Sequence, residues 1–227
     1  AKNITNTKPV IVLKGSRTEQ GAVVAKSHTA SIAGNGDIYN AVFTQSRIIK
    51  ASDNEEMLNL AKTFSKQPLP KGRGMMIISY AGSMGVTGAD TCYENGLRIA
   101  KLSQSSIEQL RSIIPSYVAV QNPVDLTFDQ HANQVADIIN VCSYEEDISA
   151  FIVNIQAEFS RTYIEPLKEL NTCGKPILLS IPCKNFVMDT VIQLEKIGFP
   201  VFETPEIAVR ILAKMYNFYT HSRIANM

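Results

Sequence analysis

The sequence predicts an α/β fold in which parallel sheets are covered by helices on both faces, and three observations support this. Short runs of consecutive apolar residues recur along the chain, and such runs are typical of strands buried on both faces. Segments with the apolar spacing of a helix separate these runs. Turns that contain glycine or asparagine follow several of the runs. Strands that alternate with helices in this way form parallel sheets.

Composition excludes several classes of protein. The 227 residues contain 22 Lys and Arg against 21 Asp and Glu, so the net charge of +1 gives no general attraction for nucleic acid or acidic membranes. Hydrophobic residues make up 45% and charged residues 19%, as in ordinary globular proteins. No apolar run reaches the roughly 18 residues that span a bilayer, and residues 1–5 show no signal segment. We therefore expect a cytoplasmic protein of one large or two modest domains.

The cysteines predict neither zinc nor disulfides. Cys92, Cys142, Cys173 and Cys183 form no CxxC pair, and none has a histidine at ligand spacing. Each lies inside or beside an apolar segment, so we expect small buried thiols in a reducing compartment. We expect no metal site in the chain.

Residues 1–66 contain too few elements for a closed three-layer domain. The expected elements are a strand at 9–13, a helix at 37–45, a strand at 48–49, and a helix that begins at a capping box formed by Ser52 and Glu55. A parallel strand needs neighbours on both sides and helices on both faces. We therefore expect 1–66 to be the second half of an α/β domain whose first half is missing or comes from a partner. Its exposed sheet edge predicts association into an oligomer.

Residues 67–74 are the best linker candidate, because they hold two prolines and two glycines without periodicity. Beyond them the expected strands are 75–79, 117–120, 148–153, 176–181 and 200–202. The expected helices are 82–95, one capped by Ser103, 135–142, 164–170, 186–197 and one that begins at Thr204 and Pro205. Five strands suit a flavodoxin-like domain over 75–227, and such domains bind ligands beyond the carboxyl ends of their strands.

The first segment that could carry chemistry surrounds His28. This histidine stands between Ser27 and Thr29 in a stretch framed by glycines, and Gly15 and Ser16 belong to the polar stretch Lys14–Arg17 that follows the first strand. Glycine-containing loops allow backbone N–H groups to approach an anion. An imidazole with a pKa near neutrality could act there as a nucleophile or as an acid and base. The alternative is a loop histidine that only hydrogen-bonds its neighbours.

Two further segments lie in the second domain. The first, Gly82-Ser83-Met84-Gly85, joins a strand to a helix, and the helix start supplies unpaired N–H donors and a partial positive charge. This segment matches neither the P-loop motif nor the GxGxxG motif of dinucleotide-binding domains. The second, Asn122-Pro123-Val124-Asp125, follows the expected strand at 117–120. Its Asp125 could orient a histidine or bind a metal, and a simple Asx turn is the alternative.

Taken together, and in this order, the three segments resemble the NDP-forming acyl-CoA synthetases. That family includes ADP-forming acetyl-CoA synthetase and, more distantly, succinyl-CoA synthetase, and the resemblance covers about residues 8–219. Residues 27–29 are similar to the family's phosphohistidine loop. Residues 80–86 with Asp90 are similar to its flavodoxin-like ligase domain, and Asn122 to Asp125 match a further signature of that domain.

The resemblance implies a phosphoryl shuttle. Acyl-CoA and phosphate give an acyl phosphate, His28 takes the phosphoryl group, and the phosphohistidine hands it reversibly to ADP on an ATP-grasp domain. The resemblance assigns phosphate binding to Gly82, Ser83, Met84, Gly85, Ser27, Thr29, Gly15 and Ser16, and a supporting role to Asn122 and Asp125.

The sequence also departs from the family. The CoA-binding domain and the ATP-grasp domain are not in this chain, so we expect them as partners that bring CoA, ADP or ATP, and magnesium. Ala30 stands where glycine is usual, and Arg17-Thr18 follows Gly15-Ser16. One alternative is therefore a non-catalytic module of the same family that senses CoA or nucleotide. Another is an unrelated flavodoxin-like binder, for which Tyr80 and Phe128 are the obvious aromatic residues at strand ends.

Overall fold

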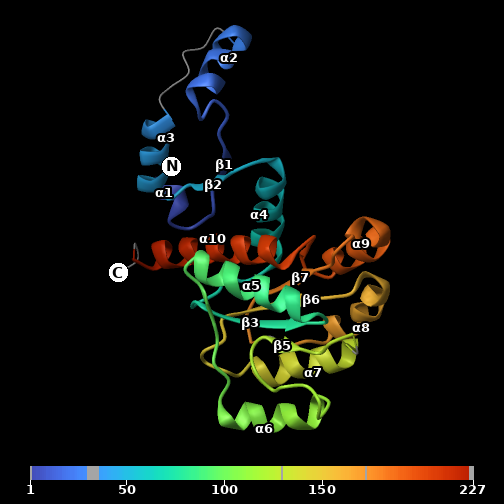
Figure 1. The fold of residues 1–227 in the computed structure, drawn as a ribbon. Coiled ribbons are helices and arrows are strands. Elements are labelled where there is room, and N and C mark those ends of the chain that lie inside the picture. Colours follow the sequence, from blue (N-terminus) through green and yellow to red (C-terminus); the bar gives the residue numbers. More distant parts are fainter. Residues whose placement is uncertain (1, 30–35, 129, 172, 225–227) are drawn as a thin grey trace. The chain divides into compact units, whose positions relative to one another are not determined.

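The computed structural model describes residues 2–29, 36–128, 130–171 and 173–224. Their contacts divide the chain into two compact units. Unit 1 comprises the described residues up to 61 and from 217 on, and unit 2 comprises residues 62–216. The boundaries fall within helices α4 (Asn54–Lys66) and α10 (Pro205–Ile224) (Figure 1). The domain boundaries expected from the sequence at 66 and 75 stay a prediction.

Unit 1 contains a two-stranded parallel sheet. Strand β1 (Ile11–Leu13) pairs with β2 (Ile49–Ala51) in the register Ile11 to Ile49, which confirms both expected strands. The helices assigned to this unit are α1 (Lys2–Thr5), α2 (Glu19–Thr29), α3 (Gly36–Gln45), most of α4 and the end of α10 from residue 217. The expected helix at 37–45 is confirmed by α3.

The stretch that carries His28 is helical up to Thr29, so the expectation of a loop there was wrong. Thr18 begins the helix, because its hydroxyl oxygen accepts a hydrogen bond from the backbone N–H of Gly21 at 3.1 Å. This is the bond of an N-capping side chain. The residues that follow contain no proline, and several are good helix formers. Ser27, His28 and Thr29 therefore form the last turn of α2.

The capping box of α4 lies one residue further along the chain than the sequence suggested. The carboxylate of Asp53 accepts from the N–H of Glu56 at 2.7 Å. In return, the Glu56 carboxylate accepts from the backbone N–H and from the hydroxyl of Ser52, both at 2.7 Å. A carboxylate is a stronger acceptor for the N–H groups at a helix start than a hydroxyl. Asp53 therefore takes the capping position expected for Ser52.

Unit 2 is built on a six-stranded parallel sheet, which confirms the expected α/β class. The strands are β3 (Gly74–Ser79), β4 (Arg98–Ile99), β5 (Val124–Asp125), β6 (Ala150–Asn154), β7 (Ile177–Ser180) and β8 (Val201–Phe202). Their order is β4-β3-β6-β7-β8, and β5 also pairs with β3, beyond the end of β4. Every residue of β3, β6 and β7 is buried, as continuous apolar runs predict for central parallel strands.

The strand expected at 117–120 does not form. Tyr117 exposes 66% of its surface, and the place beside β3 is taken by the side chain of Asn122. Its amide oxygen accepts from the N–H of Ile77, and its amide nitrogen donates to the carbonyl oxygens of Met75 and Ala100. A side chain thus satisfies backbone groups that a neighbouring strand would have paired.

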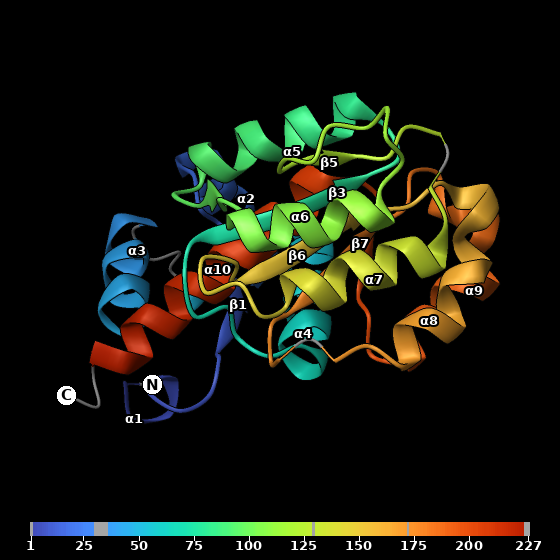
Figure 2. The same cartoon turned by 90° about the horizontal axis from the view of Figure 1, so that it is seen from below.

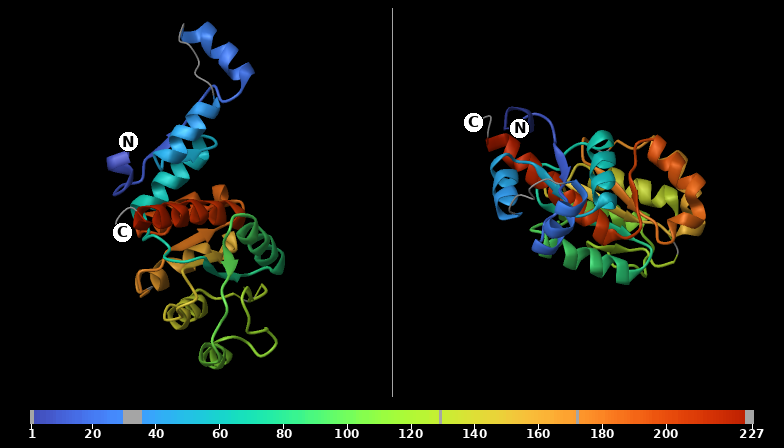
Figure 3. Two further views of the ribbon diagram at one scale, coloured as in Figure 1. Left: turned by 90° about the vertical axis from the view of Figure 1, so that its left-hand side faces the viewer. Right: turned by 90° about the horizontal axis from the view of Figure 1, so that it is seen from above.

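Helices cover both faces of this sheet. They are α5 (Gly82–Glu94), α6 (Gln104–Ile113), α7 (Ala132–Cys142), η1 (Ala157–Tyr163), α8 (Ile164–Lys168), η2 (Lys184–Val187), α9 (Met188–Lys196) and the first half of α10. Helices α6 and α7 lie side by side over one face, and their apolar residues share a core with Met76, Ile78 and Phe151 (Figure 2). Helix α5 and the first half of α10 cover the other face (Figure 3). None of the helices in the described ranges is long and apolar enough to cross a membrane.

The cysteines only partly follow the expectation of buried thiols. Cys92 and Cys142 are buried, and burial raises the pKa of both thiols to about 12. Cys173 and Cys183 are exposed, which corrects the prediction. Both stand in turns with left-handed φ angles of 51° and 58°, and turns lie at the surface of a fold. All four thiols are free.

Candidate active-site turn

The turn after β3 presents the start of α5 at the carboxyl edge of the sheet. Ala81 is the N-cap residue, its backbone is extended, and no side chain caps the helix. The carbonyl oxygen of Ala81 accepts from the N–H groups of Met84 and Gly85 at 3.2 and 3.4 Å. A helix start without a side-chain cap keeps unpaired N–H donors and a partial positive charge of about half a unit. The turn can therefore donate hydrogen bonds to an anion.

The glycines of this turn make room for the segment Asn122 to Asp125. A Cβ atom on Gly82 would lie 2.7 Å from the Oδ2 atom of Asp125, and one on Gly85 would lie 3.3 Å from Cβ of Pro123. The two motifs therefore pack closely against each other, and a side chain at Gly82 would require a shift of the Asp125 carboxylate. This packing gives a structural reason for their joint presence in the sequence.

Asp125 and Asn122, for which a supporting role was expected, both contact strand β3. Asp125 pairs with Ser79 across the β5–β3 ladder, and its Oδ1 atom accepts from the N–H of Thr127 at 2.9 Å. Asn122 fixes the other end of the segment through the three bonds to the backbone described above. The turn after β3 is thus held on one side by β5 and by the Asn122 amide.

A buried polar ladder below the turn was not expected from the sequence. The amide nitrogen of Asn154 donates to the hydroxyl of Ser79 at 3.2 Å, and its amide oxygen accepts from the hydroxyl of Ser180. All three residues are fully buried. The Ser79 hydroxyl also donates to the carbonyl oxygen of Ala81 at 2.7 Å, so the ladder reaches the N-cap of α5. The available signal is that the three most apolar strands each end in Ser or Asn.

The aromatic residues at this edge contact each other. The rings of Tyr80 and Phe128 lie 6.1 Å apart between centroids and are inclined by 56°. This tilted contact leaves no space for a planar ligand between the two rings. Burial raises the pKa of Tyr80, and the nearby Cys183 adds to the shift. The pair does not form the stacking site that a flavin would use.

The remaining candidate residues belong to unit 1. Ser27, His28 and Thr29 form the last turn of α2, where the Ser27 hydroxyl donates to the carbonyl oxygen of Val24 at 2.7 Å. Gly15 and Ser16 follow β1, and Ser16 has a left-handed φ of 55°. The candidate residues thus fall into two sets, one in each unit.

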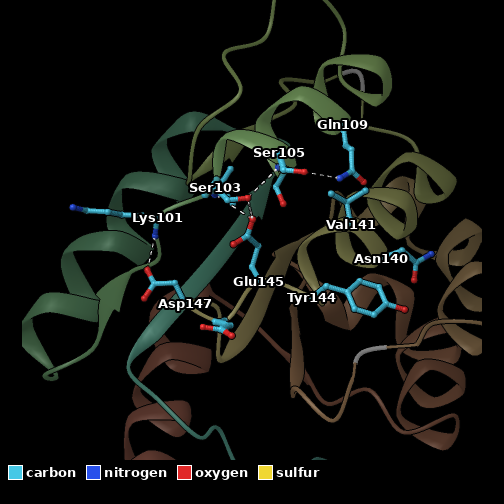
Figure 4. A pocket seen from close by; sticks show the side chains of 12 residues that line it. Lys101, Ser103, Ser105, Gln109, Asn140, Val141, Tyr144, Glu145 and Asp147 are labelled. Atoms are coloured by element: carbon cyan, nitrogen blue, oxygen red, sulfur yellow. Dashed lines mark hydrogen bonds between the residues drawn. The ribbon is translucent and has the colours of Figure 1, made fainter.

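The described residues offer no group of three or more His, Cys, Asp or Glu side chains that could hold a metal ion. A wide hollow of about 890 Å³ lies at the other edge of the unit 2 sheet, near the amino ends of β3 and β6 (Figure 4). Two carboxylates in its lining form hydrogen bonds with other lining residues. Glu145 accepts from the backbone and hydroxyl of Ser103, and Asp147 accepts from the N–H of Lys101 at 2.8 Å. The hollow is therefore separate from the turn that begins α5.

Two protein families match the chain in sequence. The succinyl-CoA ligase like flavodoxin domain matches residues 1–64, and the Ligase-CoA domain matches residues 75–223. Subunit alpha of ADP-forming acetate–CoA ligase II from Pyrococcus furiosus is 36% identical over 91% of this chain and 47% of its own length. The ADP-forming acetate–CoA ligase II of Archaeoglobus fulgidus is 32% identical over 93% of this chain and 32% of its own length.

A solved structure shares the fold. It is the dinucleotide-forming acetyl-coenzyme A synthetase 1 of Ca. Korarchaeum cryptofilum in complex with phosphate and ADP, which matches with a TM-score of 0.85 at 28% identity. The match covers 98% of this chain and 49% of that chain, so the 227 residues span about half or less of the length of these relatives. The Ligase-CoA match alone covers more than half of the residues. The chain therefore belongs to the succinyl-CoA ligase-like family of acyl-CoA ligases, to which the ADP-forming acetate–CoA ligases are related by sequence and fold.

Proposed function

We propose that the chain is the part of an NDP-forming acyl-CoA synthetase that carries the phosphoryl-accepting histidine and the ligase domain. The complete enzyme interconverts acyl-CoA, phosphate and ADP with the free acid, CoA and ATP. The observation that carries the proposal is the match of both family domains, in order, along one chain whose relatives are named ADP-forming acetate–CoA ligases. The histidine-bearing part is residues 1–66, and the ligase domain is residues 75–227.

The proposed chemistry at His28 consists of two reversible transfers. A neutral imidazole nitrogen attacks the phosphorus of the acyl phosphate, an N–P bond forms, and the carboxylate leaves with the electrons of the broken P–O bond. A terminal phosphate oxygen of ADP then attacks the phosphorus, the N–P bond breaks, and the imidazole recovers its lone pair. The attacking nitrogen must be unprotonated, which the ordinary pKa of histidine allows near neutral pH.

The phosphoryl group needs positive potential from outside α2. His28 stands in the last turn of that helix, and a helix C-terminus carries a partial negative charge. We assign the balancing positive potential to the start of α5, formed by Gly82, Ser83, Met84 and Gly85, because no side chain caps the helix there. The N–H groups of Gly82 and Ser83 are the proposed donors, since those of Met84 and Gly85 already donate to the carbonyl oxygen of Ala81. Ser27, Thr29, Gly15 and Ser16 are the proposed further donors. The packing of Asn122 and Asp125 on the turn supports their proposed role in positioning it.

Partners and cofactors belong to the same proposal. The relatives extend well beyond the matched region, and we expect a CoA-binding domain and an ATP-grasp domain or subunit in an oligomer. CoA, ADP or ATP, and Mg²⁺ are expected in that complete, cytoplasmic enzyme. Mg²⁺ would accompany the nucleotide.

A labelling experiment tests the proposal. The chain is combined with the CoA-binding and ATP-grasp parts of an ADP-forming ligase, Mg²⁺ and ATP labelled at the γ-phosphate. We expect label that is stable in base, labile in acid and lost in His28→Ala. His131→Ala and His221→Ala are matched controls that should keep the label. Label that persists in His28→Ala, or that never appears on the wild-type chain, contradicts the proposal.

One observation favours the second candidate, a non-catalytic module that senses CoA or nucleotide. The residue at position 30 is alanine where the family usually has glycine, and this departure lies in the segment that carries His28. Calorimetric titration with CoA and with ADP separates the two functions. A sensing module binds one of these ligands equally well in His28→Ala and transfers no label.

A further inference from the structure

A second pocket lies at the amino ends of β3, β6 and β7, at the edge opposite to the start of α5. Its lining includes two short segments, Lys71-Gly72-Arg73 before β3 and Cys173-Gly174-Lys175 before β7. The pocket has a volume of about 290 Å³, and Arg98, Glu146 and Asp147 also line it. The first segment belongs to the stretch 67–74 that the sequence suggested as a linker.

Close packing fixes the segment that carries Lys71 and Arg73. A Cβ atom on Gly72 would lie 2.5 Å from the hydroxyl oxygen of Ser149, and one on Gly74 would overlap the carbonyl oxygen of Asp147. A backbone hydrogen bond also holds this segment, since the N–H of Ser149 donates to the carbonyl oxygen of Gly74 at 2.7 Å. The two cations are therefore carried by backbone that is held against the sheet.

The charges around the pocket do not balance. Four cationic and two anionic side chains line it, which leaves two positive charges. Arg98 forms a two-bond ion pair with Asp147. In the described part of the chain, Lys71 and Arg73 have no carboxylate partner within ion-pair distance.

Lys175 is the innermost of the remaining cations. Its ammonium group donates to the carbonyl oxygen of Glu145, which is an uncharged partner. Burial lowers the pKa of Lys175, and the nearby Cys173, Glu145 and Cys142 offset only part of this shift. A bound anion would supply the missing compensation.

We propose that this pocket binds a pyrophosphate group, either free or as part of a nucleotide. The ammonium groups of Lys71 and Lys175 and the guanidinium of Arg73 match phosphate oxygens in charge and in donor number. A water molecule takes about 30 Å³ in the liquid, so the volume admits two phosphate groups with some water. Because the pocket lies at the opposite edge from α5, this binding is separate from the proposed phosphoryl transfer.

Calorimetry on the 227-residue chain provides the first test. The probes are sodium pyrophosphate, inorganic phosphate and ADP at constant ionic strength. We expect saturable binding of pyrophosphate, weakened about tenfold or more in Lys71→Ala/Arg73→Ala, because charge-assisted bonds are lost. The control Lys66→Ala/Lys196→Ala removes the same charge at two exposed positions outside the pocket and should bind as the wild type does. Absence of binding, or equal losses in both variants, overturns the proposal.

The exposed thiols give a second readout. Cys173 lines the pocket and Cys183 does not, and both are free and exposed. We expect pyrophosphate to slow alkylation of Cys173 by iodoacetamide and to leave Cys183 unaffected, as followed by mass spectrometry of peptides. Protection by ADP but not by pyrophosphate would contradict the proposal, because the site would then recognise another part of the nucleotide. Equal rates at Cys173 with every probe would contradict the proposal.

Discussion

Unit 1 and unit 2 differ in how much of their site geometry is fixed by packing within the unit. In unit 2, fully buried strands end in a hydrogen-bonded ladder, and the glycines of the α5 turn fit against Pro123 and Asp125. In unit 1, the parallel sheet has two strands, and Val23, Val24 and Ile38 each expose more than half of their surface. The proposed phosphate donors of α5 are thus rigidly held, whereas His28 stands on a helix with exposed apolar neighbours.

We infer that unit 2 supplies fixed hydrogen-bond donors and that unit 1 supplies the histidine that carries the phosphoryl group. A preorganised donor set stabilises charge without reorganising during the reaction. A histidine that carries a phosphoryl group between two reaction centres must instead be free to move, because it meets the acyl phosphate at one centre and ADP at the other. Substitutions should therefore change stability mainly in unit 2 and chemistry mainly in unit 1.

The largest effect is expected for Asn154→Ala. The substitution leaves the buried hydroxyl of Ser180 without its amide partner, which costs about 1–3 kcal/mol. It also removes the bond from Asn154 to the Ser79 hydroxyl, which keeps its bonds to Ala81, and this adds about 1 kcal/mol. We expect a loss of about 3 kcal/mol in the free energy of unfolding of unit 2, measured by urea denaturation. Val23→Ser, on α2 in unit 1, should change stability by less than about 0.5 kcal/mol.

A matched control for that prediction is Asn140→Ala, which removes an exposed asparagine from α7. It should change the unfolding free energy by less than about 0.5 kcal/mol. If Asn154→Ala were as mild as this control, the ladder would not hold the carboxyl edge and the contrast between the units would weaken.

Asn122→Ala should have the next largest effect. It removes three hydrogen bonds and takes the side-chain partner from the N–H of Ile77 and from the carbonyl oxygen of Ala100, while the Met75 carbonyl keeps its bond from the N–H of Ala100. We expect a cost of about 2 kcal/mol. Hydrogen exchange should show faster exchange of the Ile77 amide in the variant. Unchanged protection of that amide would mean that the side chain does not replace a strand.

The fold of unit 2 could be predicted from its central strands but not from its edge. Met75 to Ser79 and Ala150 to Asn154 are continuous apolar runs, which identify buried parallel strands. The run Tyr117 to Val120 has the same pattern, yet the competing bonds of the Asn122 side chain exclude it from the sheet. The pattern of apolar residues along the sequence carries no information on a contact between residues so far apart in the chain.

The candidate site shows the same limit. The glycines at 82 and 85 were recognisable as a helix start, and their fit to Pro123 and Asp125 required the tertiary structure. The loop expected around His28 is helical because Thr18 caps α2, a local signal that the flanking glycines concealed.

A double-mutant cycle between Gly82 and Asp125 sharpens the description of the turn. Gly82→Ala places a methyl group against Oδ2 of Asp125, and we expect a cost of about 1–2 kcal/mol from overpacking. In an Asp125→Ala background the same change should be neutral or stabilising, because alanine favours a helix more than glycine does. Thermal unfolding of the four proteins measures the coupling. Additive effects would show that the two motifs do not constrain each other.

The smallest effect concerns the ion pair between Arg98 and Asp147 at the amino edge. The Arg98 guanidinium holds the pKa of the Asp147 carboxyl at about 2, below its ordinary value. A depressed pKa contributes stability that is present above the unfolded value and is lost as the pH falls toward the folded one. We therefore expect the contribution to disappear between about pH 4 and pH 2.

The magnitude is small because about a third of each side chain or more is exposed, and exposed pairs contribute about 0.5–1 kcal/mol. Urea denaturation at pH 7 and at pH 3 should show a smaller pH dependence in Asp147→Asn than in the wild type. Glu165→Gln, which breaks the more exposed pair with Lys168, is the control with no resolvable change. If Asp147→Asn keeps the full pH dependence, the acid sensitivity of unit 2 arises from other groups than this ion pair.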